Sequence, residues 1–181
     1  MPAFHRLAAG VLTLGVFAGL ALPPTRRATA PDPAAAAGQW ARVLAAEHGR
    51  IRARFDRLLA TRDDQAARRE MLLARVARAL TRHAIAEEYV IYPALMESVR
   101  RDDARRLLDD HGEIKHFIYD LRRIPAGDPR WLVVAQEFRT HLDDHFRVEE
   151  TEVFPTFLAA LSPDENDLLV KMLSLEGSRL G

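Results

Sequence analysis

The sequence of 181 residues contains no cysteine. Disulfide bonds, iron–sulfur clusters, thiolate zinc sites and thiol catalysis are therefore excluded for this chain. An excess of charge of one sign is also lacking, because 26 Lys and Arg residues balance 26 Asp and Glu residues. A net charge of zero gives no reason to expect a nucleic acid or another polyanion as a partner.

Long apolar runs are lacking except near the N-terminus. Residues 7–22 form an apolar run of 16 residues without a charge. This run resembles the apolar region of a signal peptide and is shorter than the roughly 20 residues that a membrane helix needs. We therefore expect residues 1–22 to be a signal peptide or a short anchor, and the Pro- and Ala-rich residues 23–38 to be a linker. This favours an exported protein (periplasmic or extracellular), or one anchored by this segment, over a cytoplasmic protein.

Strand patterns are nearly absent after residue 38, and helical patterns fill the chain. Apolar residues recur at spacings of three and four over about 39–60, 63–99, 102–123 and 129–160, and a capping box at 162–165 begins a further helix. Short connections between four long helices predict that residues 39–181 form an all-α, antiparallel up-down-up-down four-helix bundle with a short extra C-terminal helix. Pro93 and Pro155 predict a kink or break in the second and fourth helices, or simply their ends.

Two segments of the chain repeat in register without a gap. Residues 82–93 read RHAIAEEYVIYP and residues 144–155 read DHFRVEETEVFP, and upstream of them EHGRI at 47–51 is matched by DHGEI at 110–114. The chain therefore contains an internal duplication whose unit is a pair of helices. Gly49 and Gly112 follow the first histidine of each copy, which predicts a close approach of the helices there, because glycine is costly inside a helix.

Each copy places a histidine and a glutamate one turn apart on an apolar helix face. The six inward-facing candidates are His48, His83, Glu87, His111, His145 and Glu149. Burying two carboxylates side by side costs several kcal/mol through desolvation and repulsion, and a metal centre removes both costs. Four imidazoles and two carboxylates form a set for two metal ions, with two histidines per metal and bridging glutamates. Such a mixed set suits iron or manganese.

These motifs resemble those of the hemerythrin-like family, whose members carry an HHE cation-binding domain. The similarity covers about residues 40–160. It implies an antiparallel four-helix bundle around two non-haem iron ions, with manganese as the less favoured metal. The resemblance also assigns roles: terminal ligands at His48, His83, His111 and His145, and bridging carboxylates at Glu87 and Glu149.

The chain departs from the oxygen-carrying members of that family. Lys115 stands where they have a fifth histidine, and the last histidine is followed by a glutamate after four residues instead of an aspartate after five. His141, one turn before the last histidine, is a candidate fifth ligand or a hydrogen-bonding partner of a ligand, and otherwise a surface residue. Glu88 and Glu150 are interpreted as surface groups or as partners of ligands.

The resemblance favours a binding protein over an enzyme, with a di-iron centre that binds O2 or NO or that senses or stores iron. The predicted apolar wall of the ligand pocket consists of Ile51, Phe55, Ile114 and Ile118. One alternative is a di-iron redox protein that acts on nitric oxide or peroxide or donates iron. Another is a metal-free helical interaction module. The oligomeric state is open, since the apolar stripe of the last helix can pack on the bundle or on a second chain.

Overall fold

The computed structural model describes residues 38–98 and 100–179. Regular structure in these ranges is entirely helical, which confirms the all-α prediction. The elements are α2 (Gln39–Leu59), α3 (Ala66–Ala86), η1 (Glu87–Ile91), α4 (Tyr92–Glu97), α5 (Arg101–Arg123), α6 (Pro129–Val148), η2 (Glu149–Val153), α7 (Phe154–Ala160) and α8 (Pro163–Arg179). The predictions for residues 1–22 and for nearly all of the linker at 23–38 lie outside the described residues. Within the described ranges, no helix has both the length and the apolar character needed to cross a membrane.

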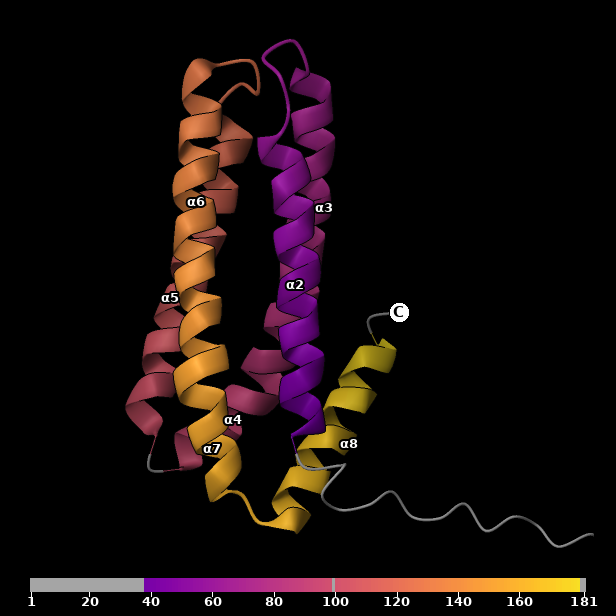
Figure 1. Cartoon of the computed structure of the whole chain (residues 1–181), viewed down its shortest axis with the longest axis vertical. Coiled ribbons are helices and arrows are strands. Elements are labelled where there is room, and N and C mark those ends of the chain that lie inside the picture. The colour runs from indigo at the N-terminus through magenta and orange to yellow at the C-terminus, as the bar shows by residue number, and fades with distance from the viewer. Residues whose placement is uncertain (1–37, 99, 180–181) are drawn as a thin grey trace, which may run out of the picture. The chain divides into compact units, whose positions relative to one another are not determined.

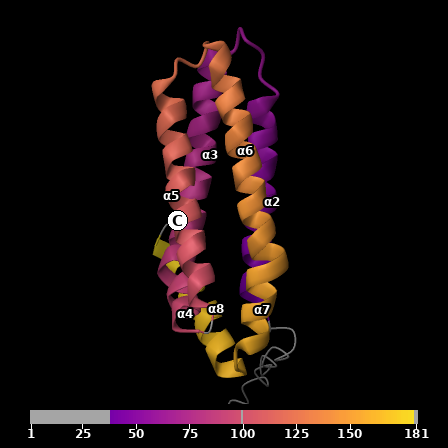
Figure 2. The ribbon, with the colours of Figure 1, turned by 90° about the vertical axis from the view of Figure 1, so that its left-hand side faces the viewer.

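The four longest helices lie side by side along a common direction. Figures 1 and 2 show α2, α3, α5 and α6 next to one another, with short connections at their ends. Each of the four contacts two others, because α2 packs on α3 and α6, and α5 packs on α3 and α6. The apolar faces of the four helices therefore enclose one interior.

The last helix, α8, folds back against this group (Figure 1) and contacts α2, α3 and η1. The predicted capping box is present at its start, where the N–H of Ser162 donates to the Glu165 carboxylate at 2.8 Å and the N–H of Glu165 donates to Oγ of Ser162 at 3.3 Å. Leu169 is buried against the bundle, whereas Leu168 and Met172 stay exposed. Packing on the bundle therefore covers only part of the apolar stripe of this helix.

Two apolar clusters make up the interior, and a polar layer lies between them. In α2, Leu44 belongs to one cluster and Ile51 to the other, and His48 lies between the two along the helix. The histidines of α3, α5 and α6 lie between the two clusters in the same way. The apolar clusters thus hold the helices together on both sides of the layer where the polar candidates meet.

Both prolines of the repeat lie within continuous helix, and a π-helical turn precedes each of them. In the first copy the N–H of Tyr92 donates to the carbonyl of Glu87, and Pro93 lies in the first turn of α4. The second copy repeats this arrangement from Glu149 to Pro155. Because proline lacks an N–H and crowds the carbonyl one turn earlier, a widened turn fits it where a regular α-turn does not. The predicted interruption is therefore a π turn, and the helices do not end at the prolines.

The two glycines of the repeat do not mark a close approach of helices, so that prediction was wrong. A Cβ atom added at Gly49 or Gly112 would meet no neighbouring atom within 4 Å, and both residues are exposed. The helical cost of glycine is the same on an exposed face as at a helix contact, so the repeated pattern alone could not tell the two apart.

Candidate metal centre

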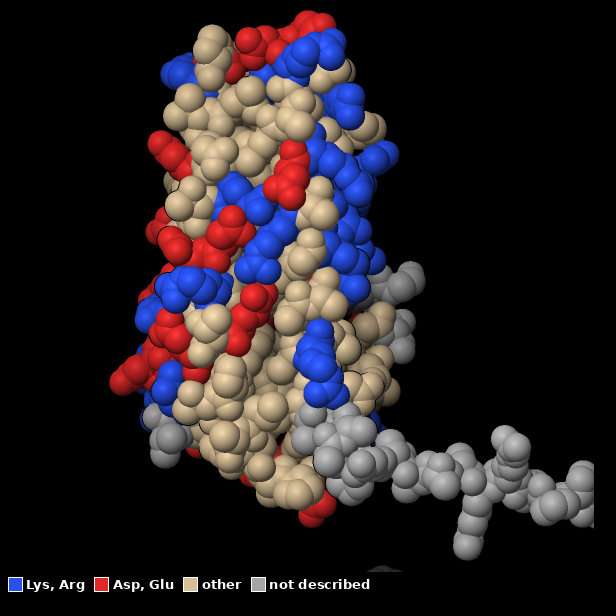
Figure 3. Space-filling model, viewed as in Figure 1, with Lys and Arg blue, Asp and Glu red and all other residues tan. Residues whose placement is uncertain are grey.

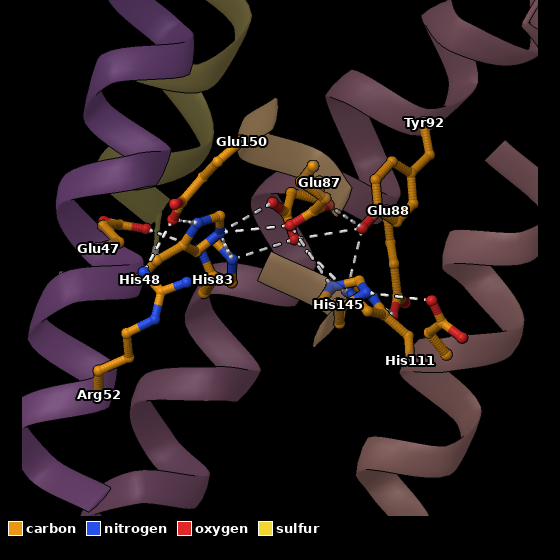
Figure 4. Close-up of polar contacts among 12 residues, drawn as sticks. Glu47, His48, Arg52, His83, Glu87, Glu88, Tyr92, His111, His145 and Glu150 are labelled. Carbon is orange, nitrogen blue, oxygen red and sulfur yellow. Dashed lines mark hydrogen bonds and ion pairs between the residues drawn. The ribbon is translucent and has the colours of Figure 1, made fainter. Parts of the chain in front are cut away.

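Six buried side chains meet in the polar layer, with exposed fractions of 0% to 2%. Figure 4 labels the four histidines and Glu87 among them. The six side chains come from all four long helices and from the first residue of each π turn: His48, His83, Glu87, His111, His145 and Glu149. The structure therefore brings together all six residues that the sequence singled out as ligand candidates.

The four histidines form two pairs whose Nε2 atoms face each other. These atoms are 2.8 Å apart in the pair His48 and His83, and 3.2 Å apart in the pair His111 and His145. Two imidazole lone pairs repel at these distances, so each pair needs a proton or a cation between its nitrogens. Each pair consists of the two histidines of one copy of the repeat.

The two buried glutamates lie between the histidine pairs. Oε2 of Glu87 is 3.2 Å from Nε2 of His83 and 3.4 Å from Nε2 of His111. Oε2 of Glu149 lies 3.4 Å and 3.5 Å from the Nε2 atoms of the two remaining histidines. Each carboxylate thus reaches one histidine of each pair. The donor atoms form two groups that could each hold a metal ion, and Glu87 belongs to both groups.

The second ring nitrogen of each of the four histidines in the centre contacts a further carboxylate at its edge. The Nδ1–oxygen distances are 2.7 Å for His48 with Glu150, 3.2 Å for His83 with Glu47, 2.8 Å for His111 with Glu88 and 3.4 Å for His145 with Asp110. A carboxylate that accepts the Nδ1 proton fixes the tautomer, so that the Nε2 lone pair is directed at the centre. This is the tautomer that a metal ion requires.

Two of these outer carboxylates, Glu47 and Asp110, were missed by the sequence reasoning. Each directly precedes the first histidine of its copy, just as Glu88 and Glu150 directly follow the glutamates of the centre. The equivalent positions of these carboxylates in the two copies could therefore have indicated that they belong to the centre. The hydrogen bonds themselves could not be read from the sequence, because every one of them joins two different helices.

Three of the outer carboxylates, Glu47, Glu88 and Asp110, are held in their charged form by a lowered pKa. The hydrogen bond to its histidine lowers the pKa of Glu47, and the same effect lowers the pKa of Asp110. Burial tends to raise the pKa of Glu88, but the contact with Lys115, at 2.7 Å from Nζ, contributes to a net lowering. Negative charge thus lies beside His83, His111 and His145 at the edge of the centre.

The charges inside the centre are uneven when no metal ion is present. Burial lowers the pKa of His83, but the Glu87 carboxylate and the hydrogen bond with Glu47 raise it to about 10. Burial tends to raise the pKa of Glu87, yet the surrounding histidines bring it well below its usual range. Burial and repulsion from Glu87 raise the pKa of Glu149 well above its usual range. One carboxylate therefore keeps its charge while the other is driven towards the neutral form.

Two oxygens of the centre are buried and have no hydrogen-bond partner among the residues that the structure describes. They are Oε1 of Glu87 and Oε2 of Glu149. Unpaired buried oxygens are rare and costly in folded proteins. A metal ion fits these oxygens together with the facing Nε2 lone pairs, because imidazole nitrogens and carboxylate oxygens are its usual protein ligands.

The comparison with known families agrees with this chemistry. The family model of the hemerythrin HHE cation-binding domain matches residues 41–157, which include all six residues of the centre. The chain belongs to the hemerythrin family. This hemerythrin-like domain is also similar to a DNA nickase of Nostoc sp., at 25% identity over 125 residues. That alignment covers 69% of this chain and 35% of the nickase, so the chain spans only about a third of that relative. No solved structure matches the chain.

Tyr92 is a further side chain of the hemerythrin-like centre that the sequence reasoning missed. Its buried hydroxyl donates to Oε1 of Glu149 at 2.6 Å and lies 3.1 Å from Nε2 of His111. Burial and the two carboxylates raise the pKa of Tyr92 well above its usual range, so the phenol stays protonated. The π turn links Tyr92 to Glu87 five residues earlier and turns both side chains to the centre. In the aligned repeats its counterpart is Phe154.

A small cavity of about 90 Å³ reaches the centre between α3 and α5. Its lining includes His83 and His111 together with Leu80, Ile114 and Ile118. Two of the four predicted pocket residues, Ile114 and Ile118, therefore lie in the wall of a cavity that touches the histidines. The rest of the wall is largely apolar, and Lys115 and Glu88 also line it.

The remaining pocket candidates and His141 do not line this cavity. Ile51 lines a different hollow between α2, α3 and α8. Phe55 packs edge-on against Phe138, with ring centroids 5.0 Å apart. The ring of His141 lies 5.7 Å from that of Phe117, and His141 belongs to neither group of potential metal ligands.

Proposed function

We propose that this hemerythrin-like domain holds two iron ions and binds a small diatomic ligand, O2 or NO, at that centre. One metal would be held by the pair His48 and His83 and the other by the pair His111 and His145. Both metals would share the bridging carboxylates Glu87 and Glu149. When bound, iron supplies an open coordination position for the gas.

The observation that carries this proposal is the pairing of facing histidines around two buried carboxylates. Four Nε2 atoms point inward, and the hydrogen bonds at Nδ1 keep the lone pairs of these atoms available. Two separate pairs support two metals instead of one, and the mixed nitrogen and oxygen set suits iron or manganese. The family resemblance favours iron.

We also propose the antiparallel up-down-up-down order for the four long helices. Only residues 60–65 join α2 to α3, and only residues 124–128 join α5 to α6. Connections this short favour antiparallel neighbours, because a parallel pair needs a chain that runs back along the whole helix. In that order each helix brings one histidine to the same level of the bundle.

The cavity between α3 and α5 is the proposed route for the gas. Leu80, Ile114 and Ile118 give it an apolar wall, which a diatomic gas can enter and which holds water weakly. The Lys115–Glu88 ion pair lies at the exposed side of this wall. Filling the cavity with Ile118→Trp should slow gas binding while leaving the metal content unchanged.

The test is made on the full chain purified from iron-supplemented cells. Elemental analysis should give about two irons per chain for a centre of this kind. The visible spectrum of the dithionite-reduced protein should change when O2 or NO is added. A folded, helical protein without iron would instead support the metal-free interaction module, and an iron-loaded protein with no response to either gas would contradict the ligand-binding role.

Tyr92 favours a second candidate, in which the centre acts in redox turnover of nitric oxide or peroxide. A buried, protonated phenol at 2.6 Å from Glu149 can hold a proton for a reaction that consumes protons. Repeated consumption of hydrogen peroxide or NO by the protein in the presence of a reductant would support turnover. A single equivalent of gas bound and released would support carriage or sensing.

A further inference from the structure

A groove on the surface of α2 and α3 is lined almost entirely by arginine. It has a volume of about 590 Å³ and its lining residues are Arg54, Arg57, Arg68, Met71, Leu72, Arg75, Arg78 and Arg82. None of these lining residues from the described part of the chain is acidic. Figure 3 shows the same concentration of Lys and Arg side chains along the α2–α3 side of the molecule. The zero net charge of the chain therefore conceals a local excess of positive charge.

The arginines form a row and not a random scatter. On α3, the lining residues Arg68, Met71, Arg75, Arg78 and Arg82 recur at spacings of three and four, so they share one helix face. Their span along the helix is about 21 Å at 1.5 Å per residue. The short connection after α2 brings Arg54 and Arg57 to the opposite side of the groove. The α3 part of this row is a local pattern that the sequence contains, whereas the position of Arg54 and Arg57 across the groove depends on how the two helices pack.

The positive charge of the groove has no counterpart within the described part of the chain. Arg57, Arg68, Arg75, Arg78 and Arg82 are exposed. None of these five has an ion pair among the described residues, whereas Arg52, Arg139 and Arg147 do. Three acidic residues of α2 and of the connection after it are engaged elsewhere, in the pairs Asp56–Arg139, Asp63–Arg69 and Asp64–Arg62.

We propose that this arginine groove binds the phosphate backbone of a nucleic acid duplex without regard to base sequence. Guanidinium groups match phosphate oxygens with paired hydrogen bonds. A row of about 21 Å lies beside a length of duplex on which each strand carries about six phosphates, because each strand has one charge per about 3.4 Å of helix axis. This binding site lies apart from the metal centre and does not depend on the function proposed for it.

The shape and composition of the groove select this ligand over others. No aromatic residue lines it, so it offers no platform for the unstacked bases of a single strand. A lipid surface is flat and is usually held by apolar side chains beside the basic ones, whereas Met71 is the single exposed apolar residue in this lining. A concave row of charge fits a rod-shaped polyanion instead. This inference revises the expectation, based on net charge alone, that no nucleic acid is a partner.

The experiment measures fluorescence anisotropy of a labelled 20-base-pair DNA duplex with the full chain over a range of salt concentrations. The groove variant is Arg75→Glu/Arg78→Glu, which leaves Arg82 beside His83 untouched. The matched control is Arg105→Glu/Arg122→Glu, with the same charge change on exposed positions of α5. Circular dichroism and metal content verify that both variants fold. A milder variant, Arg75→Gln/Arg78→Gln, replaces the first if it does not fold.

The wild-type protein and the control should bind the duplex with a similar affinity that falls steeply with salt. The groove variant should bind at least about tenfold more weakly, and the slope of log affinity against log salt should decrease by about two, one for each lost phosphate contact. Equal loss in both variants, or no binding by the wild type, would overturn the proposal. The proposal would also be overturned if the protein bound phosphatidylglycerol vesicles instead of the duplex and the groove variant lost this vesicle binding. The partner would then be a membrane.

Discussion

The two halves of the bundle, α2 to η1 and α5 to η2, build the metal centre from equivalent positions. In each half the two histidines contact each other. Within the same halves, Glu47 contacts His83 and Asp110 contacts His145. In contrast, Glu88 and Glu150 cross over and contact the first histidine of the opposite half. Neither half can therefore complete the hydrogen bonds of its own imidazoles, and the centre exists only where the halves meet.

The halves differ at the residue that follows the π turn. Tyr92 turns its hydroxyl into the centre and donates to Glu149, whereas Phe154 packs edge-on against Trp40 at a centroid distance of 5.2 Å. The residue after the π turn thus makes a polar contact in one half and packs against an apolar ring in the other. As a result the two glutamates are not equivalent, since the phenol oxygen lies 2.6 Å from Glu149 but 3.5 Å from Glu87, and Glu87 belongs to both groups of potential metal ligands.

Replacing each glutamate separately should give the largest effect and break the symmetry of the halves. Glu87→Ala removes a ligand from both groups, so we expect loss of both metals. Glu149→Ala also removes a proposed bridging carboxylate, but it leaves the group of Glu87, His111 and His145 complete, so we expect one metal to remain. Elemental analysis after gel filtration measures the difference, with the exposed Glu113→Ala as a control. Equal metal loss in the two variants would show that the glutamates act alike.

The six central residues could be predicted because their pattern is local. A histidine and a glutamate at a spacing of four lie on one helix face, and the duplication showed that His48 and His111 belong with them. The outer carboxylates were less predictable, since Glu47 reaches His83 on another helix. Sequence periodicity places a residue on a face but does not say which neighbour that face meets.

The course of the chain at the prolines was only partly predictable for a related reason. Pro93 showed that the regular hydrogen-bonding pattern must be interrupted. Whether the helix ends there depends on packing beyond it, and Tyr92 and Leu95 are buried, so continuing the helix stabilises the core. The contact of Tyr92 with the centre depends on the π turn, because this turn rotates the residues that follow it about the helix axis. The sequence did not predict this turn.

A second pair of variants tests the equivalence of the halves at the outer carboxylates. Glu47→Gln and Asp110→Asn each remove the charge that accepts the Nδ1 proton, and each should weaken metal binding about 10- to 100-fold. The measurement is competition with a chelator of known affinity. Glu113→Gln is the control, because this carboxylate is exposed on α5. Unchanged affinity in both variants would mean that these contacts do not orient the histidines.

Exchanging the residues after the π turns should have a smaller effect. Tyr92→Phe removes a buried hydrogen bond to a carboxylate, and Phe154→Tyr adds a hydroxyl beside Trp40, so each should lower the free energy of unfolding by about 1–3 kcal/mol. Only Tyr92→Phe should also change the visible spectrum of the metal-loaded protein. Denaturant unfolding and absorption spectra measure the two effects. A spectrum that is unaltered in Tyr92→Phe would place the phenol outside the chemistry of the centre.

The smallest expected effect is a gain in stability that should be equal in the two halves. Gly49 and Gly112 are exposed inside α2 and α5, and an added Cβ would meet no neighbour within 4 Å. Gly49→Ala and Gly112→Ala should therefore each raise the free energy of unfolding by about 1 kcal/mol, through the better helix propensity of alanine. Denaturant unfolding of the metal-free protein measures this. Because each glycine follows a histidine of the centre, metal content is measured as well. Loss of metal without loss of stability would show that the glycines allow the helix to change its conformation when a metal ion binds. Helix propensity alone would not explain that result.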